Sequence, residues 1–212
     1  MEYFKRNPDD QSSALRFLRD LERLAYGLFI RRADINRRIR RYADLLRAIK
    51  GGSELFTDGP LQLSSDEKSE ILEKLDGPIY SQLRVRRQLM LRLDSLLADE
   101  GVTFQHKVVS IEHVLPQNPK SGSKWLEWFP DEEIRNHWTH RLANLVLLSR
   151  RKNSQANNRD FNYKKTAYFM RGGVSPFALT TQVINEDKWT PDVLERRQEY
   201  LINKLKKEWR LD

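Results

Sequence analysis

The apolar run Leu142–Ser149 constrains the fold more than any other part of the sequence. A run that is apolar at successive positions, rather than at alternate ones, is typical of a strand buried on both faces. The run contains one asparagine, Asn144. A buried amide without hydrogen-bond partners costs about 1–3 kcal/mol, so this side chain is expected to have a use. The run therefore predicts a buried strand with one polar side chain in it.

A second stretch with strand character precedes this run. Thr103–Pro116 is rich in Val, Ile and Phe, and we expect its end, Ser110–Pro116, to pair with the apolar run. In a regular strand Glu112 and His113 point to opposite faces, so both can serve one site only if the strand ends or bulges there. Pro116 lacks a ladder donor and favours an end.

Most of the remaining chain shows the helical period. One helix is expected to turn Leu15, Leu18, Leu21, Leu24 and Leu28 inward, and a second, Ala33–Ile49, to turn Ile35, Ile39, Tyr42, Leu45, Leu46 and Ile49 inward. Further helices are predicted at Ser65–Leu75, Ile79–Leu97, within Trp125–Trp138, at Asn153–Met170 and from Thr190 onward. The predicted class is α+β and mainly helical, with a helical bundle over 1–100 for support or linkage and a second domain over 101–212.

Charge indicates a polyanionic partner. The 212 residues carry a net charge of +8, and the segment from 134 to 171 holds nine Lys or Arg against Asp160 alone. A second basic cluster lies between Arg31 and Arg41, where a solvated helix face and phosphate contact are equally good readings.

The sequence has no cysteine, which excludes disulfides and fits the cytoplasm, and no signal peptide or membrane span.

Phosphodiester hydrolysis needs a base to activate water and a cation to neutralise developing charge. His113 can be the base, because an unperturbed imidazole titrates near neutrality. Glu112 and Asn153 offer the oxygen ligands that magnesium prefers. If Lys152–Phe169 returns over the strands as a helix, these groups converge. A zinc pair at His137 and His140 has less support, since there is no cysteine and no nearby carboxylate pair.

These residues resemble the ββα-metal, or HNH, nucleases. Glu112-His113-Val114-Leu115-Pro116-Gln117 looks like the first part of their motif, Asn144 the middle and Asn153 the last. More narrowly, 109–168 is similar to the C-terminal nuclease domain of GmrSD-type modification-dependent restriction enzymes, a group that includes the phosphorothioate-sensing nuclease SspE. Two positions depart from the pattern, because Ala143 stands where the family usually has glycine and Asn153 replaces a histidine.

The resemblance implies an HNH-type nuclease domain over 101–212. His113 and Asn144 would be the catalytic residues, His113 as the general base and Asn144 as the side chain that keeps the strands in register. Glu112 and Asn153 would be ligands of Mg²⁺ or Mn²⁺. The expected nucleic-acid contacts are Arg141, Arg150, Arg151, Lys152, Asn157, Lys164 and Lys165.

The predicted function is a metal-dependent DNA endonuclease that serves as the effector of a modification-dependent restriction system against phage. Its partners would be double-stranded DNA and an upstream nucleotide-dependent sensor domain of the same protein, without a membrane. Two alternatives stay open, a DNA-binding module with an inactive nuclease motif and an RNA-directed nuclease.

Overall fold

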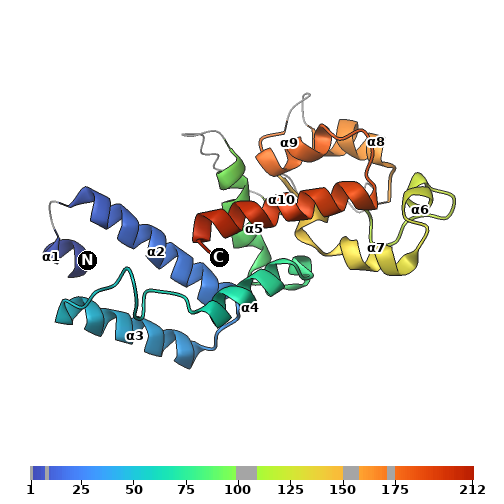
Figure 1. The fold of residues 1–212 in the computed structure, drawn as a ribbon. Helices are drawn as coiled ribbons and strands as arrows, with labels where there is room; N and C mark the ends of the chain where they lie inside the picture. The colour runs from blue at the N-terminus through green and yellow to red at the C-terminus, as the bar shows by residue number, and fades with distance from the viewer. Residues whose placement is uncertain (1, 8–9, 99–108, 150–157, 171–174) are drawn as a thin grey trace. The chain divides into compact units, whose positions relative to one another are not determined.

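The computed structural model describes residues 2–7, 10–98, 109–149, 158–170 and 175–212 (Figure 1). It divides into two compact units, Met1–Lys74 with Lys206–Asp212, and Leu75–Leu205. The described residues are mainly helical with one two-stranded sheet, which confirms the predicted α+β class. The predicted domain boundary at residue 100 stays a prediction, since 99–108 lie outside the described residues. In the described part of the chain, no helix combines the length and the apolar character needed to cross a bilayer.

The first unit contains α1 (Glu2–Arg6), α2 (Gln11–Ile30), α3 (Ile35–Gly51) and most of α4 (Ser65–Leu75). Asp10 caps α2 by accepting a hydrogen bond from the Ser13 backbone N–H at 2.8 Å. The expected inward stripe of α2 is partly wrong, because Leu15 and Leu18 are about half exposed, at 50% and 49%. Leu24 and Leu28 are buried as predicted, and Phe17 takes the place of Leu15 and Leu18 on the buried stripe.

The inward face predicted for α3 needs a similar correction. Ile35, Ile39 and Leu46 are exposed, and Leu45 and Ile49 are buried. The predicted helix at 65–75 is confirmed, and its first turn is closed by a capping box. There Ser64 Oγ accepts from the Glu67 backbone N–H at 3.2 Å, and the Glu67 carboxylate accepts from the Ser64 N–H at 3.0 Å.

The second unit begins with a short 3₁₀ turn, η1 (Ile79–Ser81), followed by α5 (Arg86–Leu97). The single helix predicted over Ile79–Leu97 is therefore wrong in its first turns. Tyr80 donates its backbone N–H to the carbonyl of His140 at 3.0 Å, so it makes no helical bond to a carbonyl four residues back.

The hairpin consists of β1 (Ser110–His113) and β2 (Leu145–Leu148), paired antiparallel with Ser110 opposite Leu148 and His113 opposite Leu145. The predicted pairing is confirmed, although the second strand starts three residues later than predicted, after the 3₁₀ turn η2 (Leu142–Asn144). Two short helices, α6 (Lys124–Trp128) and α7 (Glu132–Thr139), connect the strands and are separated at Pro130 as predicted.

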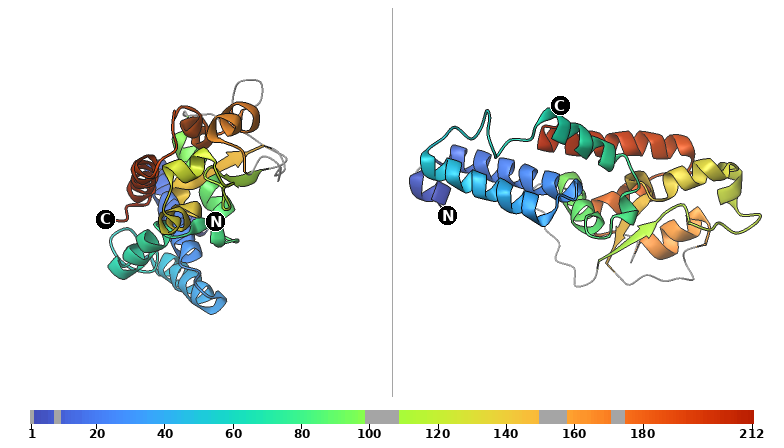
Figure 2. Two further views of the ribbon diagram at one scale, coloured as in Figure 1. Left: turned by 90° about the vertical axis from the view of Figure 1, so that its right-hand side faces the viewer. Right: turned by 90° about the horizontal axis from the view of Figure 1, so that it is seen from below.

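The helix predicted over Asn153–Met170 is shorter than expected in its described part. It starts at Phe161, as α8 (Phe161–Tyr163), and continues as the π-helical turn η3 (Lys164–Phe169), while 158–160 form no helix. The helix α9 (Ala178–Ile184) was not predicted. The last helix, α10 (Pro191–Trp209), begins where Thr190 and Pro191 indicated (Figure 2).

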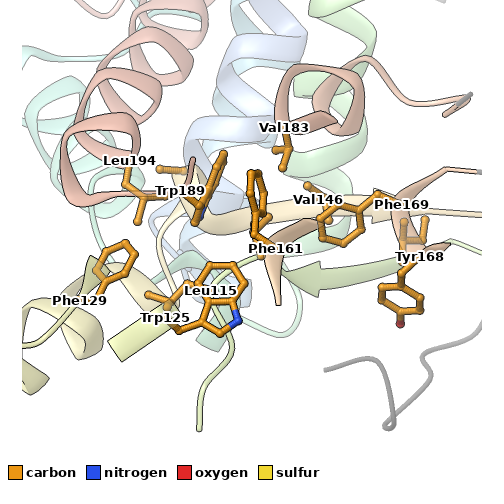
Figure 3. Close-up of a cluster of buried hydrophobic side chains, with 13 residues drawn as sticks. Leu115, Trp125, Phe129, Val146, Phe161, Tyr168, Phe169, Val183, Trp189 and Leu194 are labelled. Carbon is orange, nitrogen blue, oxygen red and sulfur yellow. The ribbon is translucent and has the colours of Figure 1, made fainter. Parts of the chain in front are cut away.

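The hydrophobic core of the second unit lies on one face of the hairpin (Figure 3). Trp125 and Trp189 are its largest members, and the ring centroids of Phe161 and Trp189 lie 5.6 Å apart. Val146 of β2 reaches the same cluster. The strands, α6, α8, η3 and α10 therefore share one core, which fixes the end of β1 where the predicted site lies.

Candidate active site

His113, the predicted base, is the last residue of β1 and is buried, with 8% of its surface exposed. Its Nε2 atom lies 3.1 Å from Nδ1 of His140, within hydrogen-bond distance. The ring of Tyr80 lies against it, with centroids 4.1 Å apart. The histidine therefore sits between two aromatic side chains at the point where the strand ends.

Asn144 is fully buried and makes four hydrogen bonds. Its Oδ1 atom accepts from the Leu115 backbone N–H at 2.7 Å and from the Trp189 indole N–H at 3.1 Å. Its Nδ2 atom donates to the carbonyls of Leu115 and Thr139, both at 3.0 Å. The side chain thus ties the chain just after His113 to the start of β2. This is the geometry that holding the strands in register requires, and a catalytic role for Asn144 stays a prediction.

Lys164 is almost fully buried, and its predicted contact with a phosphate group stays a prediction. Its ammonium group donates to the carbonyls of His113 at 3.0 Å and Val114 at 2.8 Å. Burial lowers the pKa of Lys164 to about 7, and the charge of Glu112 opposes that change. Lys164 therefore supports the backbone at the end of β1 and does not present a cation to solvent.

Glu112 is buried next to His113 in the sequence, but the two side chains leave the strand on opposite faces. The pairing is regular up to His113, with Glu112 opposite Val146 and His113 opposite Leu145. Residues directly opposite in antiparallel strands share a face, so Glu112 lies on the face of Val146. The bulge that would turn both side chains toward one site is not present in β1. A metal-ligand role for Glu112 stays a prediction.

The predicted nucleic-acid contacts are only partly described. Arg141 is half-buried and pairs with Asp76 at 2.7 Å, and Lys165 donates to the carbonyl of Glu186. Both cations thus have partners inside the second unit. The remaining predicted residues lie outside the described part of the chain, namely Arg150, Arg151, Lys152, Asn157 and the predicted metal ligand Asn153.

Several arginines of the basic cluster in the first unit form ion pairs within that unit. Arg31 pairs with Glu67 at 2.5 Å and Glu70 at 2.6 Å, and Arg41 pairs with Glu67 at 3.1 Å. These groups, with Arg32 and others, line a cavity of about 660 Å³. Four acidic side chains line the same cavity, so much of the cluster's charge is neutralised locally.

Sequence reasoning missed two supports of the site in α10. Arg197 is buried and donates to the carbonyls of Ala143, Leu145 at 3.3 Å and Leu179 at 3.0 Å. Gln198 accepts from the Ala143 backbone N–H at 2.8 Å. Burial lowers the pKa of Arg197 to about 9, which still leaves the guanidinium charged at neutral pH. The sequence does contain a sign of their burial, because positions 197 and 198 lie on the same helical face as the apolar residues 194, 201 and 205.

Tyr80 and His140 were also missed as neighbours of His113. The helical pattern predicts Tyr80 on a regular helix, and the sequence offers His140 as a zinc ligand with His137 and as part of the run that resembles the nuclease family. In the described residues no group of three or more His, Cys, Asp or Glu side chains could hold a metal ion. His140 faces His113, whereas His137 is exposed.

The arrangement can perform proton transfer at a fixed position. A neutral imidazole can accept a proton from water, and the backbone that follows His113 is held by Asn144 and Lys164. Rigid support of this kind keeps a base in a productive geometry.

A buried histidine at the end of a hairpin, in a mainly helical α+β protein, defines a candidate centre for acid–base catalysis. A family model for the C-terminal domain of GmrSD restriction endonucleases matches residues 65–204. The match covers well over half of the chain, so the chain belongs to this family, which confirms the resemblance. The matched segment includes every described residue of the candidate site. The comparison with curated proteins gave no match.

Proposed function

We propose that the chain cleaves DNA as the effector domain of a modification-dependent restriction enzyme, through an HNH-type centre in which His113 is the general base. The observation that supports this most directly is the position of His113. It ends β1, is held by its neighbours and lies within the segment matched by a family of restriction endonucleases.

In this proposal His113 accepts the proton of the attacking water as that water adds to phosphorus, and the bond between phosphorus and the leaving 3′ oxygen breaks. Asn144 and Lys164 act on the backbone next to His113, so they hold the base in place without touching the substrate. A positioned base of this type contributes roughly 10²–10⁴-fold to a rate.

The reaction would use Mg²⁺ or Mn²⁺. When bound, the cation neutralises charge that develops on the phosphate and the leaving oxygen. Glu112 is a carboxylate with hard oxygen donors, and magnesium needs few protein ligands because it keeps several waters, so the donor chemistry fits. The carboxylate leaves β1 on the face opposite to His113, so one shared site requires the backbone at the end of β1 to bring the two groups together. Glu112 and Asn153 would hold the ion.

The substrate would be double-stranded DNA, and the basic segment from 134 to 171 supports a polyanionic partner. An upstream sensor domain that recognises the modified base or backbone would control access to the substrate. This partner comes from the family resemblance.

Nicking of supercoiled plasmid DNA tests the proposal. The wild-type chain and His113→Ala are compared with Mg²⁺, with Mn²⁺ and with a chelator, and His137→Ala serves as an exposed histidine control. We expect wild type and His137→Ala to nick in a metal-dependent way and His113→Ala to be inactive. Equal nicking by all three overturns the role of His113. DNA binding without nicking by any of them identifies a binding module, and cleavage of RNA alone identifies an RNA-directed enzyme.

A further inference from the structure

His113 and His140 form a pair of imidazoles that come from different elements of the second unit. Nε2 of His113 and Nδ1 of His140 are 3.1 Å apart, and the two ring planes are inclined at 67°. A hydrogen bond between two imidazoles needs one ring nitrogen to donate and the other to accept. The contact therefore links the proton position on one ring to that on the other.

Tyr80 holds His140 through two contacts. The His140 backbone carbonyl accepts a hydrogen bond from the Tyr80 backbone N–H at 3.0 Å, and the ring of Tyr80 stacks on the ring of His140, with centroids 5.5 Å apart and planes inclined at 11°. The same Tyr80 ring lies 4.1 Å from the ring of His113. Arg86 fixes Tyr80 in turn, with its guanidinium 4.3 Å from the centre of the ring and its NH1 atom 2.8 Å from the Tyr80 carbonyl oxygen.

We propose that His140 is a positioning residue that orients the imidazole of His113 and determines which of its ring nitrogens carries the proton before water is activated. The inference rests on the proposed function of His113. With the lone pair on Nδ1 of His140 accepting a hydrogen bond from Nε2–H of His113, Nδ1 of His113 is the nitrogen left to accept the proton of water. The hydrogen bond to His140 stabilises the imidazolium, as a carboxylate or carbonyl does for other catalytic or metal-binding histidines.

The surroundings of His140 favour the required state. Burial lowers the pKa of His140, which favours the neutral ring that can act as an acceptor. His137, one helical turn earlier, is exposed, and its ring faces Trp138. The chain thus offers a matched control, a histidine of similar chemistry that does not contact His113.

Two substitutions separate the hydrogen bond from the stacking contact. His140→Phe keeps a ring against Tyr80 but removes the hydrogen bond to His113. His140→Asn removes the ring but places a polar atom near the position of Nδ1. His137→Phe is the control, and circular dichroism with thermal unfolding establishes that each variant folds.

Single-turnover cleavage of plasmid DNA and DNA affinity are measured for each variant. We expect His140→Phe to lower the rate at saturating DNA by roughly 10–100-fold, the usual effect of losing a group that orients a functional histidine. DNA affinity should stay within about twofold. His140→Asn should recover part of the rate, and His137→Phe should behave as wild type. A wild-type rate in His140→Phe, or no advantage of His140→Asn over it, overturns the inference.

Nitrogen chemical shifts of the histidine rings supply a readout that is independent of activity. In ¹⁵N-labelled protein the ring shifts of His113 should change in His140→Phe and stay unchanged in His137→Phe. Unchanged His113 shifts in a folded His140→Phe variant contradict the inference. If His113→Ala cleaves DNA normally, the proposed function fails. If His113→Ala is inactive and His140→Phe is fully active, only the role of His140 fails.

Discussion

Replacing Asn144 by alanine removes the side chain that joins the end of β1 to the start of β2. The amide is fully buried, and its four hydrogen bonds, between 2.7 and 3.1 Å, satisfy two donors and two acceptors. Each buried polar group left without a partner costs about 1–3 kcal/mol, and the two N–H donors should contribute most. Because neighbours relax around the small cavity, we expect a total loss of about 3–5 kcal/mol in the free energy of unfolding.

Urea denaturation followed by circular dichroism measures this loss. Asn136→Ala is the matched control, because Asn136 is exposed on α7, and its effect should stay within about 0.5 kcal/mol. Asn144→Asp keeps the size and one acceptor but turns its second oxygen toward the carbonyls of Leu115 and Thr139. It should destabilise at least as much as alanine. A loss below about 1 kcal/mol in Asn144→Ala, or a wild-type stability in Asn144→Asp, refutes this reasoning.

Three further predictions concern neighbouring groups. Burial lowers the pKa of Lys164 to about 7 from 10.5, so between about pH 7 and pH 10 the unfolded chain binds more protons than the folded chain. The stability of wild type relative to Lys164→Met should therefore rise from about pH 7 to about pH 9 in denaturation curves, and a constant or falling difference contradicts this. Arg197→Met leaves buried carbonyls without their donor and should cost about 3–5 kcal/mol, whereas Arg196→Met breaks an exposed ion pair with Glu186 and should cost less than about 1 kcal/mol. Equal losses in these two variants argue against the buried role of Arg197. If Glu112 binds the metal, Glu112→Gln should raise the Mg²⁺ concentration for half-maximal cleavage by roughly tenfold or more, and Glu127→Gln on the exposed side of α6 should not. An unchanged Mg²⁺ requirement removes Glu112 as a ligand.

The hairpin could be predicted from the sequence because β2 is apolar throughout and the segment that ends in β1 is rich in β-branched residues and is followed by Pro116. The importance of Asn144 could also be predicted, because a polar side chain within an apolar run needs hydrogen-bond partners. The partners themselves could not be predicted. Trp189 is far from Asn144 in sequence, and Thr139 belongs to α7. Both contact the Asn144 amide only because the core packs these segments together.

Lys164 shows what the charge of a segment does not predict, namely the burial of one of its lysines. A lysine in a basic segment is most often exposed, and the sequence gives no sign that η3 turns this one inward onto the carbonyls of His113 and Val114. The predicted inward faces of the first two long helices were partly wrong for a related reason. Leu15 and Ile35 match the helical period, but the period alone does not decide which of two adjacent stripes is covered.

Tyr80 and His140 illustrate the limit for the site itself. Their contact with His113 depends on a backbone hydrogen bond between residues 60 positions apart, from Tyr80 to His140. No local sequence pattern predicts such a long-range hydrogen bond. The sequence therefore identified the residue proposed to act as the base but not the groups that orient it.

The rate of DNA cleavage by His113→Ala, measured at saturating DNA with Mg²⁺ and together with its DNA affinity, tests the central claim most directly. The proposed general base predicts a fall of at least roughly 10²-fold in the rate, with DNA affinity unchanged within about twofold. Cleavage by His113→Ala at the wild-type rate would contradict the claim.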